Sequence, residues 1–159
     1  EINPAVIALR EAFQVPPDGA HFRVIEGDGA LHIRESPALH DVILVDGFSP
    51  QGQPEALATQ DFYDACRAAL QPDGVLVVNL DSDPDTSEPL LARLERSFAG
   101  GLKTLLSDGG TNRIALAATP RVLWEARRHA RHRLQALPAV HRETLGRLSG
   151  ATGGWPVLG

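Results

Sequence analysis

The chain has 159 residues, 43% of them hydrophobic and 22% charged, which is typical of one soluble globular domain. Its formal net charge of −5 argues against general attraction to nucleic acid, and no apolar run approaches the roughly 18 residues that a membrane-spanning helix needs. The only cysteine, Cys66, excludes an internal disulfide and a thiolate metal cluster, so we expect a cytoplasmic protein without a metal cofactor.

The N-terminal part predicts a helix, a short strand and a second helix. Asn3 suits an N-cap and Pro4 a first helical position, so the first helix is expected over residues 4–13. A strand over 21–26 follows, and after a Gly-Asp-Gly turn a helix of one or two turns is expected over 30–35.

Two continuous apolar runs, at residues 42–45 and 75–78, are typical of parallel strands covered by helices on both faces. Thr59 is placed to cap a helix between them. The side chains that share one face of this helix are Phe62, Cys66 and Leu70. A further helix is expected over 88–98.

Turn-forming residues between segments 103–107 and 113–118 predict an antiparallel hairpin. Strands that alternate with helices and end in such a hairpin resemble the doubly wound, Rossmann-like α/β sheet of S-adenosylmethionine-dependent methyltransferases. We expect this domain over residues 1–120 and a C-terminal helical extension over 121–159. The extension reads as a helix over 122–136, a break at a proline, a shorter helix and a Gly-rich tail.

Asp28 and Asp46 follow two of the expected strands, and Glu1 reads as the end of a strand that runs straight into the first helix; in such folds ligands bind at this edge of the sheet. Glu1 is placed to accept hydrogen bonds from both hydroxyls of a ribose; the alternative is an exposed acid near a helix N-terminus. Asp28, followed by Gly29, is placed to accept a hydrogen bond from an adenine amine beside open backbone; the alternative is an ordinary turn aspartate.

Asp46 ends the most apolar strand and is the catalytic candidate, because a carboxylate there can orient or deprotonate an amine. The alternative is that Asp46 only caps backbone groups of the turn over 47–50.

These segments resemble successive motifs of the spermidine synthases over roughly residues 1–120. The matching stretches are Glu1–Pro4, Gly27–Gly29, Asp41–Asp46 and Phe62–Tyr63. The loop Asp46–Pro50, with Gly52 and Pro54 after it, is similar to the family's catalytic loop, in which two aspartates stand three residues apart. Ser49 occupies the place of the second aspartate.

The resemblance implies aminopropyl transfer from decarboxylated S-adenosylmethionine to a small amine such as putrescine. Glu1 would then bind ribose and Asp28 adenine, Gly52 and Pro54 would wall the adenine side, and Asp46 would position and deprotonate the amine. Ser49 and Tyr63 would lie on the substrate side.

The chain departs from this family at its beginning, since nothing before Glu1 corresponds to the first strand and its Gly-rich loop. We therefore expect a truncated domain that is not competent in this form and that exposes a strand edge, which a homo-oligomer or an upstream segment would cover. Two other functions stay open: a methyltransferase that uses S-adenosylmethionine, and a non-catalytic nucleoside-binding or assembly module.

Overall fold

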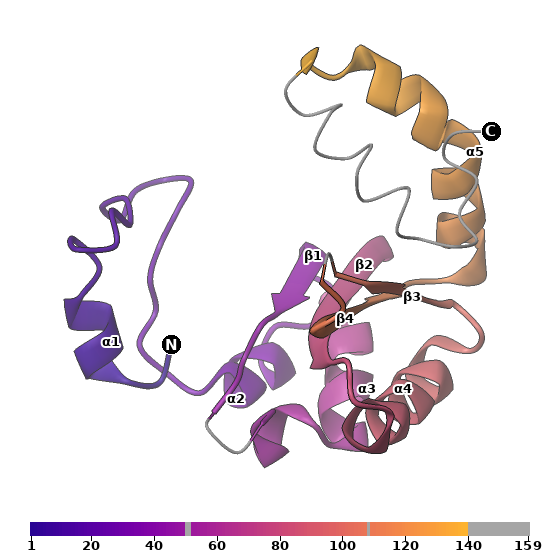
Figure 1. Ribbon diagram of the computed structural model, residues 1–159. Helices are drawn as coiled ribbons and strands as arrows, with labels where there is room; N and C mark the ends of the chain where they lie inside the picture. Colours follow the sequence, from indigo (N-terminus) through magenta and orange to yellow (C-terminus); the bar gives the residue numbers. More distant parts are fainter. Residues whose placement is uncertain (50–51, 108, 140–159) are drawn as a thin grey trace.

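The centre of the molecule is a mixed four-stranded sheet in the order β1-β2-β4-β3 (Figure 1). The computed structural model describes residues 1–49, 52–107 and 109–139. β1 (His40–Val45) runs parallel to β2 (Leu70–Asp81), and β4 (Asn112–Ala117) is antiparallel to both β2 and β3 (Leu102–Leu106). Both predicted apolar strands and the predicted hairpin are therefore confirmed.

One face of this sheet carries the hydrophobic core. This face packs against the helices α3 (Gln60–Ala69) and α4 (Pro84–Phe98). The helix α2 (Gly29–Arg34) packs against α3, and the one-turn helix η1 (Glu55–Leu57) contacts α2 and α3. The side chains that meet there alternate along the strands and recur every three or four residues along the helices. They include Leu76, Val78, Leu80, Phe62, Cys66, Leu94 and Phe98.

Capping residues fix where the two long helices begin. The Thr59 side chain accepts a hydrogen bond from the Phe62 amide, as predicted for the start of α3. α4 begins at Pro84, four positions before the predicted start at Glu88. The reason is local: Asp83 caps the helix through the Asp85 amide, and a proline suits the first helical position because it has no N–H to satisfy.

The N-terminal segment departs most from the predictions. α1 (Pro4–Ala8) is capped by Asn3 as expected but stops well before residue 13. Val6 and Phe13, two apolar residues of the predicted helix, are exposed. A short helix with no buried face lacks the packing that stabilises most protein helices, which explains the early end. The strand predicted over residues 21–26 does not form: in the described structure this segment pairs with no strand of the sheet.

The second face of the sheet is not covered in the same way. Val42 and Leu44 point away from the core and are 55% and 73% exposed. Within the described structure β1 pairs with β2 alone, so its other edge is open. The expectation of an open apolar edge thus agrees with the structure, whereas self-association through it stays a prediction.

After β4 the chain continues into α5 (Pro120–Ala136), which matches the helix predicted over 122–136 and starts two residues earlier. The expected shorter helix and Gly-rich tail lie outside the described residues. The proposed boundary at residue 120 stays a prediction. Searching the described part of the chain reveals no helix whose length and apolarity would suit a membrane crossing.

Candidate functional site

A hydrogen-bonded row of three polar side chains crosses the sheet near the carboxyl ends of β1 and β2. The amide nitrogen Nδ2 of Asn79 donates to Oδ1 of Asp46 at 2.9 Å. Nδ2 of Asn112 in turn donates to Oδ1 of Asn79 at 2.8 Å. Because the Asn79 carbonyl faces a donor, its NH₂ group is turned toward the carboxylate. Asp46 is thereby held in place by a donor to one of its carboxylate oxygens.

Sheet geometry explains why these residues meet. Val45 pairs with Val78 in the parallel ladder, so Asp46 lies next to Asn79 on the adjoining strand. In the antiparallel ladder Asn79 pairs with Ile114, two residues from Asn112 and on the same face. The sequence analysis missed both asparagines: Asn79 directly follows an apolar run, and Asn112 was counted among the turn formers of the hairpin.

Ser49 and Gly52, in the segment after β1, are bonded to each other. Each of the two residues donates its backbone N–H to the carbonyl of the other, at 2.8 and 3.0 Å. The Ser49 hydroxyl also donates to the Gly52 carbonyl at 3.0 Å. Gly52 has a φ of +103°, a conformation in which a side chain would be strained. Pro54 follows as the N-cap residue of η1.

Glu1 and Asp28 come close together although they are far apart in the sequence. The Gly27 amide donates to the Glu1 carbonyl at 2.9 Å. The Glu1 side chain accepts a hydrogen bond from the Asn3 amide through Oε1, and Asp28 caps α2 by accepting one from the Ala30 amide through Oδ1. The bonds of the described residues thus occupy one oxygen of each carboxylate and leave the other for a ligand.

The surroundings of these two acids suit an approaching planar group. A Cβ atom built on Gly29 would meet no heavy atom within 4 Å, so the backbone beside Asp28 is open. α2 contacts η1, which follows the loop after β1 (Figure 1). The adenine role of Asp28, the ribose role of Glu1 and the wall formed by Gly52 and Pro54 stay predictions, as does the convergence of all three acids on one nucleoside.

Tyr63 occupies a different environment from the other candidates. Its side chain is 0% exposed and packs against Phe62, with ring centroids 5.5 Å apart. Burial raises the pKa of Tyr63 to about 12, and the neighbouring Gln53 amide opposes this effect. The structure therefore gives Tyr63 a position in the core, while its predicted contact with substrate stays a prediction.

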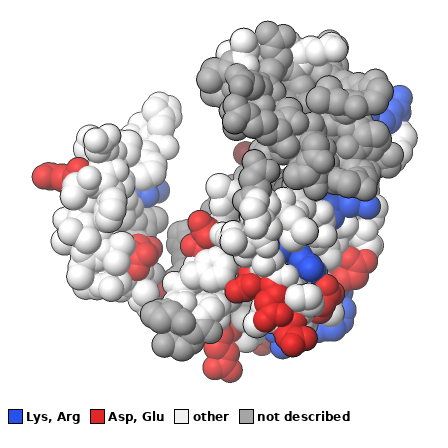
Figure 2. All heavy atoms as spheres, in the orientation of Figure 1, with Lys and Arg blue, Asp and Glu red and all other residues white. Residues whose placement is uncertain are grey.

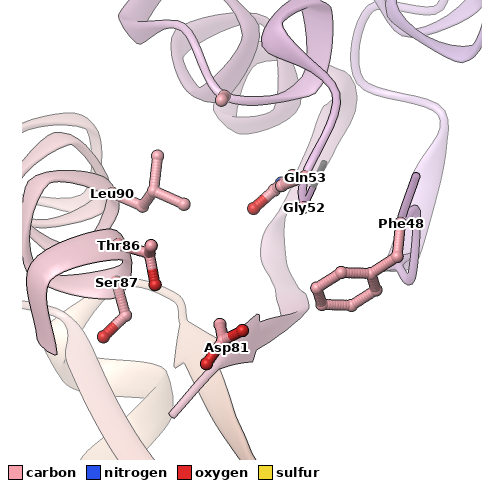
Figure 3. Close-up of a pocket in the computed structure, with 8 residues that line it drawn as sticks. Phe48, Gly52, Gln53, Asp81, Thr86, Ser87 and Leu90 are labelled. Atoms are coloured by element: carbon pink, nitrogen blue, oxygen red, sulfur yellow. The ribbon is translucent and has the colours of Figure 1, made fainter. Parts of the chain in front are cut away.

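A pocket of about 240 Å³ opens between the loop after β1 and the first turns of α4 (Figure 3). Gly52 and Gln53 line it from the loop, Asp81 lines it from the end of β2, and Leu90 lines it from α4. Figure 2 shows acidic side chains gathered on this part of the surface, where β2 leads into α4. The exposed acids of the segment are Asp81, Asp83, Asp85 and Glu88. No group of three potential metal ligands occurs among the described residues.

Comparison with known proteins gives consistent matches. The spermine/spermidine synthase domain matches residues 9–102, more than half of the chain. A polyamine aminopropyltransferase of Chromobacterium violaceum is 37% identical over 132 residues, which are 80% of this chain and 51% of that protein. A polyamine aminopropyltransferase of Neisseria meningitidis serogroup B is 37% identical over 118 residues, 74% of this chain and 45% of that protein. The chain thus spans about half the length of these relatives.

Solved structures agree on the fold. A probable spermidine synthase from Corynebacterium glutamicum matches with a TM-score of 0.66 at 21% identity, over 74% of this chain and 45% of that one. Human methyltransferase-like protein 13, solved in complex with SAH, matches with a TM-score of 0.66 at 24% identity, over 75% of this chain and 59% of that one.

These neighbours confirm the predicted Rossmann-like, methyltransferase-type α/β fold. The family match covers Asp28, Asp46, Ser49 and Tyr63, and so includes most of the candidate residues. On this evidence the chain belongs to the spermine/spermidine synthase family.

Proposed function

We propose that this chain supplies the amine-activating side of an aminopropyltransferase, which transfers the aminopropyl group of decarboxylated S-adenosylmethionine to a small amine such as putrescine. The observation that carries the proposal is the Asp46 carboxylate, held at the end of β1 by Asn79 and backed by Asn112. The relatives of matching sequence are polyamine aminopropyltransferases, which supports this reaction over methyl transfer.

Asp46 would act on the attacking nitrogen. A carboxylate within hydrogen-bond reach of an ammonium group orients it and accepts its proton, which frees the nitrogen lone pair. The nitrogen then bonds to the aminopropyl carbon as the carbon–sulfur bond breaks, and the bonding pair stays on sulfur in methylthioadenosine. The proton on Asp46 passes to solvent. Asn79 leaves Oδ2 of Asp46 for this exchange because it bonds to Oδ1.

The nucleoside would lie on the other side of the loop after β1. Glu1 and Asp28 each keep one carboxylate oxygen for a ribose hydroxyl or an adenine amine, and the open backbone at Gly29 leaves room for a flat ring. A related solved structure, a spermidine synthase in complex with the transition-state analogue AdoDATO, matches at a TM-score of 0.62 and supports a ligand of this class.

Replacement of Asp46 tests the proposal. In the full-length protein, with an upstream segment restored before Glu1 and with decarboxylated S-adenosylmethionine and putrescine as substrates, we expect Asp46→Asn to lower the rate of methylthioadenosine release at least about tenfold, because asparagine cannot accept the proton. Asp41→Asn, at the exposed opposite end of the same strand, serves as the control and should keep the wild-type rate.

The same assay separates the alternatives. Unchanged turnover in Asp46→Asn would reject the role of this residue. Release of S-adenosylhomocysteine from S-adenosylmethionine, with no methylthioadenosine formed, would point to a methyltransferase instead. Nucleoside binding without turnover of either substrate would leave only a binding module.

A further inference from the structure

We propose that one face of α5 binds single-stranded RNA, with Arg128 in contact with a phosphate and the indole ring of Trp124 stacked on a base. This inference does not depend on the proposed function, because α5 begins at the other end of the sheet. The candidate site lies at the carboxyl end of β2, whereas Arg121, in the first turn of α5, is bonded to Asp73 near the amino end of that strand.

Positive charge is concentrated in α5 although the chain as a whole is acidic. Residues 1–119 contain 18 aspartates and glutamates against eight lysines and arginines. α5 contains five arginines and a single acidic residue, Glu125. Exposed charges act over about one Debye length, roughly 8 Å at physiological ionic strength. A polyanion at α5 therefore meets this local positive charge rather than the net charge of the chain.

The described side chains of α5 bring charge and an aromatic ring onto one face. Arg121, Trp124 and Arg128 are spaced three and four residues apart, so they follow one another along the same side of the helix. The sequence has an arginine again at position 131, the next of this spacing. At about 1.5 Å per residue, positions 121–131 extend roughly 15 Å along the axis. α5 thus carries a stripe of positive charge that contains a tryptophan.

Trp124 and Arg128 form a stacked pair that is open to solvent. The guanidinium carbon of Arg128 lies 4.6 Å from the centroid of the Trp124 ring, and Trp124 is 55% exposed. Arg128 is exposed and takes part in none of the ion pairs found among the described residues. Arg121 differs, since it pairs with Asp73 and Glu125. The charge of Arg128 is therefore available to a phosphate, and the indole offers a surface to a planar ring.

The composition of α5 favours RNA over a lipid surface. Apart from two histidines, its basic residues are all arginines, whose planar guanidinium groups bind phosphate through paired hydrogen bonds and also stack on bases. An exposed tryptophan stacks on bases that are unpaired, as they are in RNA loops. A helix that lies on a membrane instead needs large apolar residues opposite its charges. In α5 the tryptophan lies on the arginine stripe, and Val122 and Leu123 are half-buried.

The test is fluorescence anisotropy of the 159-residue chain with a labelled oligouridine of about 12 nucleotides, at several salt concentrations. We expect Arg128→Gln to raise the Kd at least about fivefold. It should also lower the slope of log Kd against log salt by about 0.7, the value for one phosphate contact on a single strand. Trp124→Leu should raise the Kd at least about fivefold and leave the slope unchanged, since it removes stacking but no charge.

Two variants serve as matched controls. Arg96→Gln removes the same charge from an exposed position on α4, and Phe13→Leu exchanges an exposed aromatic ring of the N-terminal segment. Neither should change the Kd for oligouridine. An equal loss in a control, an unchanged Kd in Arg128→Gln or Trp124→Leu, or no binding of oligouridine to the wild type would overturn the proposed RNA surface.

Other polyanions are separated by parallel measurements. An RNA duplex should bind more weakly than oligouridine and without dependence on Trp124, because its paired bases stay stacked on one another. Tighter binding of oligodeoxythymidine than of oligouridine would overturn the choice of RNA. Vesicles of phosphatidylglycerol and phosphatidylcholine should leave the chain in the supernatant after sedimentation. Binding to these vesicles without binding to oligouridine would assign the arginine stripe to a membrane surface and reject the proposal.

Discussion

The two faces of the sheet are built from the same strands, but one carries buried apolar side chains and the other carries the hydrogen-bonded polar side chains of the candidate site. Along β2, Leu76, Val78 and Leu80 are fully buried under α3 and α4, whereas Asn79 between them points to the other face and bonds to Asp46. A strand turns successive side chains to opposite faces, so one residue decides between packing and chemistry. Stability thus resides on the helix-covered face, and the candidate catalytic groups lie on the opposite face at its carboxyl end.

The largest expected effect contrasts the two faces directly. Leu76→Ala removes a fully buried side chain and should lower the free energy of unfolding by about 2–5 kcal/mol, as is typical for core leucines. Leu44→Ala on the opposite face should cost less than about 1 kcal/mol, because that side chain is mostly exposed. Urea denaturation monitored by circular dichroism measures both. An equal cost would mean that the second face is buried in solution, as in a self-associated chain.

Two titratable side chains buried on the helix-covered face, Cys66 and Tyr63, should make the free energy of unfolding depend on pH. Burial raises the pKa of both Cys66 and Tyr63 to about 12, from reference values of 9.0 and 10.0. Well below pH 9 both groups are protonated in the folded and the unfolded chain, so their full contribution is present. As the pH rises toward 12 the unfolded chain releases these protons first, and stability falls by up to about 1.4 kcal/mol per pH unit for each group.

Urea denaturation between pH 8 and 11 tests this dependence. Cys66→Ser is not a suitable control because it buries a hydroxyl, whereas Cys66→Ala keeps the site apolar and should reduce the slope above pH 9. Stability that is independent of pH in this range would contradict the buried positions of both side chains. Slow reaction of Cys66 with a thiol reagent in the native state, and rapid reaction in urea, is the accompanying observation.

How well the sequence predicted the fold depended on packing. The apolar runs at 42–45 and 75–78 and the hairpin formed as expected, because alternate side chains along these strands pack into the core on one face, although the predicted helical cover of the second face did not form over Val42 and Leu44. The helix over 4–13 rested on an equally clear local pattern but formed only over Pro4–Ala8, because no described element covers Val6 or Phe13. The strand over 21–26 did not form. Local pattern is decisive only where tertiary contacts reinforce it.

The candidate site was predictable in part for a related reason. The rule that ligands bind at the carboxyl ends of parallel strands made Asp46 a candidate, and it lies at the end of β1; Asp28 was chosen by the same rule, but no strand precedes it in the described structure. The rule did not identify Asn112, whose contribution depends on the register of an antiparallel strand that returns from far along the chain. It also did not identify Asp81 as part of a pocket, since α4 begins four residues earlier than expected and brings Thr86 and Ser87 to that place.

The smallest expected effects are losses of kcat on replacing the two asparagines that support Asp46. Asn79→Ala removes the donor to the Asp46 carboxylate and should lower kcat about tenfold, as expected for a hydrogen bond to a charged group. Asn112→Ala leaves that donor in place and only frees the orientation of the Asn79 amide, so a loss of about threefold is expected. Thr111→Ala, at the neighbouring exposed position, should have no effect.

The double variant Asn79→Ala/Asn112→Ala decides whether Asn112 acts through Asn79. If it does, the double variant should have the same kcat as Asn79→Ala, because the group that Asn112 orients is already absent. Multiplicative losses, about thirtyfold together, would mean that Asn112 contacts the reacting groups independently. In the first case the hairpin supports the catalytic carboxylate by positioning alone, and the uncovered face of the sheet works as one connected unit from β4 to β1.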